Sequence, residues 1–200
     1  MKRIDLGPTP LAYPLPAFLV GTYDSEGKAN IMTVAWGGLC CSEPPCVAVS
    51  IRPGRYSHEA VIARKAFTVN VPSVALAGKV DFAGMACGKT SDKFRELGLT
   101  AEPSSFVDAP CVAQCPLILE CRLRHTLELG SHTQFIGEIL EGKRGIPGLS
   151  FDRLCLCYCV LQATQVESLN AWDAILSNSV DWLTPVWTAW HSRLSTSRCI

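Results

Sequence analysis

Hydrophobic and polar positions alternate along residues 117–141, which is the pattern of a half-buried β-strand. Odd-numbered positions from 117 to 129 are mostly apolar, and the even-numbered positions between them carry Glu, Arg and Thr side chains. A Gly-Ser pair at 130–131 then separates this run from a second strand-like run at 132–141. The segment therefore predicts one long β-hairpin.

Strand-like segments also dominate the first third of the chain. An apolar stretch at 13–22 is followed by the turn residues of 23–30 and by a second strand-like segment at 30–38. A turn with two prolines at 41–45 leads into a further strand at 46–51. These segments indicate a β-hairpin followed by another strand.

Three short helices are predicted after these strands. Ser57 is the candidate N-cap of the first, at 58–66, where Glu59 lies in the first turn and basic residues lie in the last. A strand follows at 67–72, in which Asn70 is expected to hydrogen-bond backbone groups, because Asn is depleted in strands without such a role. The other two helices are expected from Ser73 to about Ala83 and over 91–97, before Gly98.

Composition and charge limit the classes of partner. The chain has 200 residues, and its 18 Lys and Arg side chains cancel its 18 Asp and Glu side chains. Without blocks of like charge, attraction to nucleic acid or to an acidic membrane surface is not expected. The start of the chain lacks the unbroken apolar stretch of a secretory signal, and its apolar runs are shorter than the roughly 20 residues that span a bilayer. We therefore predict a cytoplasmic protein that binds neither membrane nor nucleic acid.

Eleven cysteines are present, most of them inside apolar, strand-like segments. In a chain without an export signal, this usage predicts reduced thiols that behave as small buried hydrophobes. Residues expected in this state include Cys40, Cys41, Cys46 and Cys121. An alternative is a metal or thiol site on the segment that carries Cys155, Cys157 and Cys159, but the spacing is not C-x-x-C and no fourth ligand is evident. No metal site is therefore predicted.

The end of the strand at 46–51 places two arginines at one corner of the predicted fold. Arg52 lies on the face opposite the apolar side chains of this strand, and a Pro-Gly turn separates it from Arg55. Ser57 begins the next helix, whose first N–H groups and dipole favour an anion. A phosphate monoester uses all of these groups, because guanidinium forks match its oxygens. The alternative is a solvated turn in which the arginines pair with acids such as Glu59.

Six segments resemble, in their order and spacing, the flavin reductase-like family of FMN-binding split barrels, and they are nearest to its flavoredoxin type. They are "NIMTVAW", "SEPPCVAVSIRPGRYS", "FTVNVP", "DKFRELGLT", "LECRLRHTLELG" and "SHTQFIGEI". The resemblance covers about residues 8–142. It implies a mainly β fold, a six-stranded Greek-key split β-barrel with short α-helices, and a homodimer with FMN at or near the subunit interface.

The resemblance also implies the site residues. Those that would run beside the isoalloxazine ring are Asn30, Met32, Thr33, Val34, Ala35 and Trp36. Those that would hold the ribityl chain and phosphate are Ser50, Arg52, Arg55, Tyr56 and Ser57. His132 lies in a segment similar to the family's Gly-Asp-His motif, with Ser131 where Asp is usual, and it would be the catalytic residue nearest the nicotinamide. Residues Lys89, Asp92, Lys93 and Phe94 would lie beside the cofactor or a partner subunit, or would form an exposed helix start with solvated charges.

The function implied is that of an NAD(P)H:FMN oxidoreductase, with NADH or NADPH as a transient co-substrate. The absence of a G-x-G-x-x-G fingerprint fits a cofactor that is bound only transiently. The alternative is a flavoredoxin-like carrier that keeps its FMN and receives electrons from a redox partner protein. We predict a flavin reductase-like domain at 1–142 and a divergent extension at 143–200, which lacks the Gly- and Tyr-rich segment of the family.

Overall fold

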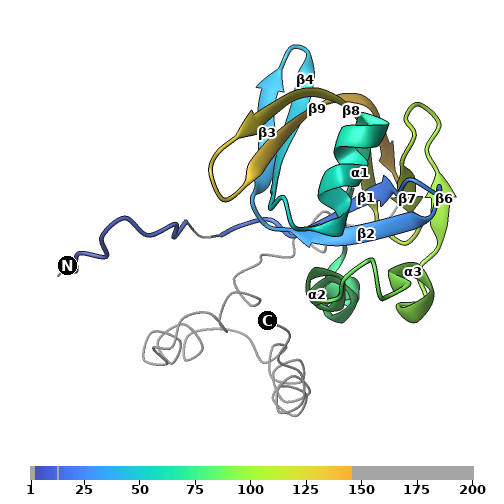
Figure 1. The fold of residues 1–200 in the computed structure, drawn as a ribbon, viewed down its shortest axis with the longest axis horizontal. Coiled ribbons are helices and arrows are strands. Elements are labelled where there is room, and N and C mark those ends of the chain that lie inside the picture. The colour runs from blue at the N-terminus through green and yellow to red at the C-terminus, as the bar shows by residue number, and fades with distance from the viewer. Residues whose placement is uncertain (1–2, 13, 146–200) are drawn as a thin grey trace, which may run out of the picture. The chain divides into compact units, whose positions relative to one another are not determined.

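The computed structural model describes residues 3–12 and 14–145, whose main feature is an antiparallel sheet of seven strands (Figure 1). Its strands are β1 (Phe18–Tyr23), β2 (Ala29–Val34), β3 (Gly37–Ser42), β4 (Pro45–Ile51), β5 (Ala66–Val71), β8 (Leu117–Glu128) and β9 (Thr133–Arg144). Their order across the sheet is β2-β1-β5-β8-β9-β4-β3, and β6 (Ala101–Pro103) pairs with β7 (Pro110–Val112) in a separate ribbon.

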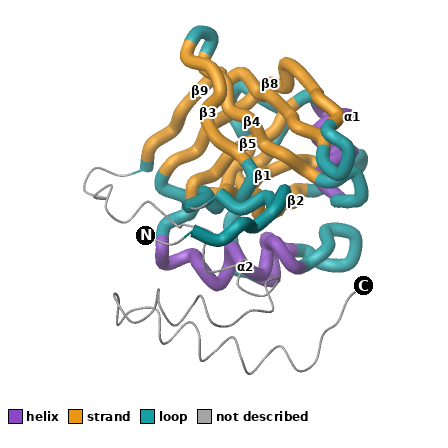
Figure 2. The backbone as a smooth tube through the Cα atoms, turned by 90° about the vertical axis from the view of Figure 1, so that its left-hand side faces the viewer, coloured by secondary structure: helices purple, strands orange, loops and turns teal. Residues whose placement is uncertain are grey.

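Short helices fill the connections between the strands. They are α1 (Tyr56–Arg64), the 3₁₀ helix η1 (Val74–Leu76), α2 (Ala77–Met85) and α3 (Lys93–Glu96). Figure 2 shows α2 beside the edge of the sheet that β2 forms. Among the described residues, no helix is long and apolar enough to cross a membrane. The mainly β fold class is confirmed, although the main sheet has seven strands rather than the predicted six.

The core lies inside the curved sheet and beneath α1. Alternate residues of adjacent strands point to this side, and their apolar side chains exclude water from one another. The cluster consists of Val20, Val34, Val47, Val49, Ile51, Val61, Phe67, Val69, Cys121 and Phe135. Burial of these side chains holds β4, β5 and β9 together, and it fixes where the loops at their ends emerge.

The predicted strand at 30–38 is interrupted in the structure. β2 ends at Val34, and β3 begins at Gly37 on the opposite edge of the sheet. Between them, the carbonyl of Trp36 accepts a backbone hydrogen bond of 2.8 Å from Ser50 of β4. The chain leaves one edge of the sheet and joins the other here, which an apolar run in the sequence does not reveal.

The predicted hairpin of 117–141 is confirmed by β8 and β9. Leu119, Cys121 and Leu123 belong to the core cluster or pack against it, so the odd positions face inward as the alternation predicts. Glu120 lies on the opposite face, in register with Thr68 of β5. It is nevertheless buried, because the loop at 104–109 covers it, and the alternation within β8 does not reveal this loop.

The cysteine prediction is half correct. Cys46 and Cys121 are buried, but Cys40 and Cys41 are exposed on β3, the strand at the edge of the sheet. All cysteines in the described part of the chain are free thiols. Cys155, Cys157 and Cys159 lie outside the described residues, as does most of the extension predicted at 143–200.

Asn70 has the structural role expected from the sequence. Its amide group donates to the carbonyl of Leu19 at 2.9 Å, and its side-chain oxygen accepts from the N–H of Val112 at 2.8 Å. The side chain is fully buried, so these two bonds satisfy backbone groups of Leu19 and Val112 that water cannot reach. Asn70 therefore joins β1 and β7 through β5.

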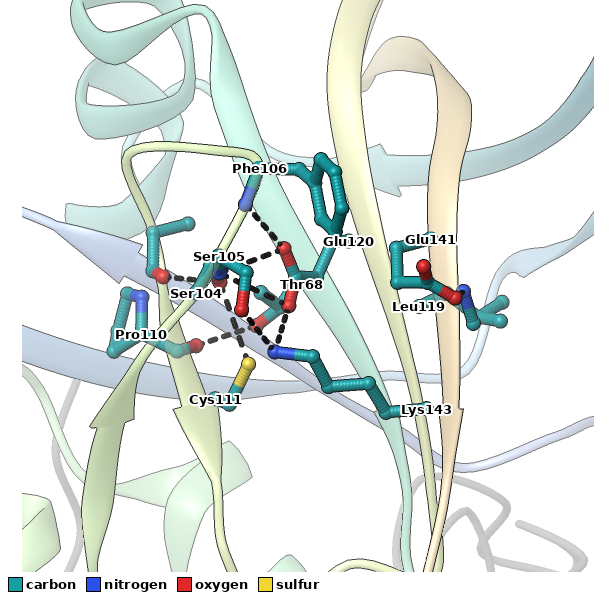
Figure 3. A network of polar contacts seen from close by, with 12 residues as sticks. Thr68, Ser104, Ser105, Phe106, Pro110, Cys111, Leu119, Glu120, Glu141 and Lys143 are labelled. Atoms are coloured by element: carbon teal, nitrogen blue, oxygen red, sulfur yellow. Dashed lines mark hydrogen bonds and ion pairs between the residues drawn. The ribbon is translucent and has the colours of Figure 1, made fainter.

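Glu120 and Lys143 form an ion pair at the open end of the β8–β9 hairpin (Figure 3). The carboxylate also accepts hydrogen bonds from the N–H of Phe106 at 2.8 Å and of Ser105 at 3.0 Å. Burial by itself raises the pKa of Glu120, but Lys143 and the two N–H groups outweigh it, so the pKa lies below its ordinary 4.5. The pair thus fastens the loop at 104–109 to the sheet.

We expect Glu120→Gln to reduce the unfolding free energy by about 2 kcal/mol at neutral pH, because a charged acceptor of several hydrogen bonds is lost. A carboxyl group with a depressed folded-state pKa stabilises the fold above its unfolded pKa, and this contribution is lost as pH falls through the folded value. The difference between variant and wild type should therefore shrink below pH 4.5. Urea denaturation across pH measures it, with exposed Glu128→Gln as the control. A difference that is independent of pH would contradict this account.

Candidate functional site

The candidate site is built from segments that are far apart in the sequence, and a buried hydrogen bond ties two of them. The side-chain amide of Asn30 on β2 donates to the hydroxyl of Ser57 in the first turn of α1 at 2.9 Å. Both side chains are buried. This bond places the two predicted cofactor-binding segments, 30–36 and 50–57, side by side.

The sequence predicted Ser57 as the N-cap of helix α1, and that prediction is wrong. The N-cap position is occupied by Arg55, whose extended backbone (φ −82°, ψ 139°) precedes helix residues that begin at Tyr56. No side-chain cap hydrogen bond is present at this end of α1. The N–H of His58 donates to the carbonyl of Arg55 at 2.9 Å, so the N–H groups of Tyr56 and Ser57 are the ones left for an anion, which the helix dipole favours there.

Arg52 and Arg55 are both exposed at this corner. A turn brings them together, because the N–H of Arg55 donates to the carbonyl of Arg52 at 3.0 Å. Both residues therefore directly precede the uncapped helix terminus, with Arg55 at the N-cap position. The corner has the donors that a phosphate group requires: two positive charges that persist at any working pH and backbone N–H groups.

The hydroxyl of Tyr56 is engaged outside the arginine corner. Its hydroxyl donates to Asp24 in the β1–β2 turn at 2.7 Å, and this bond, followed by burial, raises the pKa of Tyr56 to about 12. Gly88 packs against the other side: a Cβ at this position would lie 2.6 Å from the side-chain oxygen of Asn30 and closer still to the Tyr56 ring. Tyr56 therefore shapes the corner through its ring rather than its hydroxyl.

Trp36 and His132 lie against each other beside the corner. Their ring centroids are 4.6 Å apart with a tilt of 36°, and the other contact of the imidazole is with the hydroxyl of Ser131 at 2.9 Å. Burial lowers the pKa of His132, and nearby Arg52 lowers it further. Both effects favour the neutral form of His132, which borders the tryptophan ring and lies near the arginine.

A groove of about 480 Å³ runs beside Trp36. Its lining comes from β3, β4, β9 and the segment before β1, and it comprises Pro10, Ala12, Leu15, Trp36, Gly37, Gly38, Leu39, Cys40, Ala48, Ser50 and Gln134. Ser50 and Trp36 therefore face a mostly apolar space, and apolar walls around a few polar groups are typical of a small-molecule site.

Other residues predicted to run beside a flavin ring direct their side chains elsewhere. Val34 is part of the core cluster, Met32 packs against it, and the hydroxyl of Thr33 donates to the carbonyl of Val80. Ala35 is half-buried between β2 and Trp36. Along this segment, backbone groups rather than these side chains are therefore available at the edge of the sheet that β2 forms.

Lys93 is buried, which corrects the alternative of an exposed helix start with solvated charges. Its ammonium group donates to the carbonyls of Ile31 and Ala83, both at 2.8 Å. Burial lowers the pKa of Lys93 from 10.5 to about 8; Cys87 opposes this shift and Arg55 adds to it. Phe94 is buried too, whereas Asp92 caps α3 by accepting from the N–H of Arg95 at 3.3 Å. Lys89 is exposed.

Sequence reasoning missed several residues that position the site. His58 joins α1 to the start of β9 through the hydroxyl of Thr133 at 2.9 Å, next to His132. Asp24 organises the β1–β2 turn by accepting from the N–H groups of Glu26 and Lys28, both at 2.9 Å. An Asp at the start of a Gly-containing turn is a usable sequence signal. No such signal marked the burial of His58.

Comparison with known proteins identifies the family. A sequence model described as a flavin reductase like domain matches residues 11–151. The chain belongs to the flavin reductase-like family. The match begins shortly before β1 and extends past the end of β9, so it includes every element of the candidate site.

Solved structures and curated relatives agree with this membership. The flavoredoxin of Desulfovibrio vulgaris (Miyazaki F) is 46% identical, with a TM-score of 0.70 over 78% of this chain and 83% of its own. A flavoredoxin from Methanosarcina acetivorans is 27% identical, with a TM-score of 0.71 over 78% and 84%. An uncharacterized protein of Archaeoglobus fulgidus is 35% identical over 133 residues, which cover 66% of this chain and 74% of that protein. A structure from Shewanella frigidimarina, described as having a split barrel domain, is 24% identical with a TM-score of 0.62 over 71% of this chain and 73% of its own, which confirms the split-barrel fold class.

We expect Lys93→Met to change how stability depends on pH. A base with a lowered folded-state pKa binds fewer protons than the unfolded chain between pH 8 and 10.5, so its contribution to stability rises with pH in that window. The rise attributable to Lys93 is up to about 3 kcal/mol, at 1.36 kcal/mol per pKa unit. The unfolding free energy of Lys93→Met, measured by urea denaturation, should not show this rise with pH. That of Lys89→Met, which changes an exposed lysine, should show it. Identical pH profiles for Lys93→Met and wild type would contradict the assignment.

Proposed function

We propose that this protein is an FMN-binding redox protein that acts as an NAD(P)H-dependent flavin oxidoreductase. The observation that carries the proposal is the corner where Arg52 and Arg55 directly precede the uncapped start of α1, next to Trp36, His132 and the apolar groove. This arrangement combines a site for a phosphate with a site for a flat ring. The similarity to flavoredoxins supports a flavin rather than another phosphorylated ligand.

The residues present fit the phosphate end of FMN. Arg52, Arg55 and the N–H groups of the first α1 turn would hold the phosphate, because guanidinium forks and an uncapped helix terminus both favour an anion. Ser50 would contact the ribityl chain. Ser57 would contribute through its backbone, since its hydroxyl already accepts the hydrogen bond from Asn30.

The ring would lie beside the edge of β2 and the segment that follows it. Backbone groups of residues 30–36 would meet its polar edge, and Trp36 would border it. When bound, FMN supplies the capacity to accept a hydride and to pass electrons on, and the protein supplies orientation and electrostatics. His132 would be the side chain nearest to the nicotinamide.

A second candidate function is supported by the identity of 46% to a flavoredoxin. In that case the protein would keep its FMN and receive electrons from a redox partner protein, without direct oxidation of NAD(P)H. We further propose a homodimer in the cytoplasm. Exposed Leu39 on the edge strand β3, and exposed Leu127 and Leu129 at the end of β8, offer apolar surface for subunit contact.

We expect Arg52→Ala and Arg55→Ala each to weaken FMN binding about 10- to 100-fold, because each removes a charge-assisted hydrogen bond to the phosphate. Titration of FMN fluorescence with the purified protein measures the dissociation constant. Arg95→Ala, which removes an exposed guanidinium from α3, is the matched control and should bind as wild type does. Wild-type affinity in the Arg52→Ala/Arg55→Ala double variant would overturn the site.

We expect NADH or NADPH to bleach the flavin absorption near about 450 nm when it is mixed anaerobically with the FMN-loaded protein, because a hydride passes to the flavin. His132→Ala should retain FMN but slow the bleaching at least about tenfold, since it removes a group that positions the nicotinamide. Reduction by dithionite is the control for bound, redox-competent FMN. Dithionite bleaching without any response to either nicotinamide would favour the electron-carrier function instead.

A further inference from the structure

Two cysteines lie directly opposite each other in the β3–β4 hairpin. Cys41 of β3 and Cys46 of β4 are register partners, and the pair after them, Ser42 and Pro45, closes the strands toward the turn. Opposed residues of an antiparallel pair have Cα atoms about 4.5–5.5 Å apart and side chains on the same face. Disulfides form over Cα separations of about 4.4–6.8 Å. The backbone therefore meets the distance requirement without moving.

The two side chains also approach each other. Burial is the main cause that raises the pKa of Cys46, and the neighbouring Cys41 adds to it. The Cys41 thiol donates to the carbonyl of Glu43 at 3.4 Å, within the turn that joins the two strands. Both residues are free thiols in this structure. Two free thiols on opposed residues of an antiparallel pair are the reduced form of a cross-strand disulfide site.

The exposures of the two sulfurs differ in a way that suits stepwise oxidation. Cys41 is exposed at the edge of the sheet, whereas Cys46 is 3% exposed behind it. An oxidant from solvent reaches Cys41 first, and Cys46 lies where it can attack the product. Cys40, also exposed, lies at the register shift between Leu39 and Cys41 and has no strand partner, so it is less suited to pair with Cys46.

We propose that Cys41 and Cys46 form a redox-active dithiol that hydroperoxides convert to a cross-strand disulfide. The Cys41 sulfur attacks the O–O bond of hydrogen peroxide, which gives a sulfenic acid and one water. The Cys46 sulfur then attacks the Cys41 sulfur, the S–S bond forms, and the hydroxyl group leaves as a second water with the Cys46 proton. Two thiols are oxidised by two electrons while one peroxide is reduced to two waters.

The position of the pair indicates a reversible modification. The bridge would close only the short loop of residues 42–45, and bridges across short loops add little stability. It would lie on an edge strand, where a dithiol reductant can reach the Cys41 sulfur. A metal site is a poorer explanation, because within residues 3–12 and 14–145 no group of three or more His, Cys, Asp or Glu side chains could hold a metal ion.

The test is a thiol map of the full chain before and after a small molar excess of hydrogen peroxide. Free thiols are labelled with N-ethylmaleimide in denaturant, and the tryptic fragment of residues 29–55, which contains Cys40, Cys41 and Cys46, is weighed by mass spectrometry. We expect three labels before oxidation. After oxidation we expect one label and a bridge that removes two hydrogens, and dithiothreitol should restore all three labels.

Single variants distinguish this pair from its neighbours. Cys41→Ser should keep both remaining thiols labelled after peroxide, and Cys40→Ser should lose both labels as the bridge forms. Cys41 and Cys40 are exposed, so neither variant threatens the core, and circular dichroism checks the fold. Three labels on the oxidised wild type, a bridge that survives in Cys41→Ser, or a cross-link between two chains would each overturn the proposal. No step of this test requires bound flavin.

Discussion

The buried hydrogen bond between Asn30 and Ser57 is the constraint on which the candidate site depends. It joins the edge strand β2 to the first turn of α1 at 2.9 Å, in surroundings from which water is excluded. A buried polar pair of this kind is costly to separate, because each group would lose its partner. The ring side and the phosphate side of the proposed site are consequently held in one fixed relation.

The positive charge at the corner comes from a few neighbouring side chains and not from the net charge of the protein. The chain has no net charge, yet Arg52 and Arg55 directly precede an uncapped helix terminus and Lys93 is buried nearby. Burial is the main cause of the lowered pKa of Lys93, and repulsion by Arg55 adds to it, so these two positive groups repel each other. A bound phosphate would offset this repulsion, which is a further reason to propose that an anion binds at the corner.

The sequence predicted those parts of the fold that depend on local pattern. The β8–β9 hairpin, the helix after the arginine corner and the role of Asn70 follow from periodicity, charge order and residue preference. The burial of Glu120 was not predicted, because it depends on the loop at 104–109, which lies over the outer face of β8 and is not visible in the pattern of β8 itself. Ser57 was misplaced as a cap for a similar reason, since its partner Asn30 lies 27 residues away in the chain. The burial of Lys93 likewise depends on carbonyl groups that β2 and α2 supply.

The most direct test of the phosphate-binding corner compares the affinities of the purified protein for FMN and for riboflavin, which differ only by the phosphate group. Isothermal titration calorimetry of both ligands gives the two dissociation constants under the same conditions. Several charge-assisted hydrogen bonds to the phosphate predict that FMN binds at least about 100-fold more tightly than riboflavin. Equal affinities for the two flavins would contradict the account.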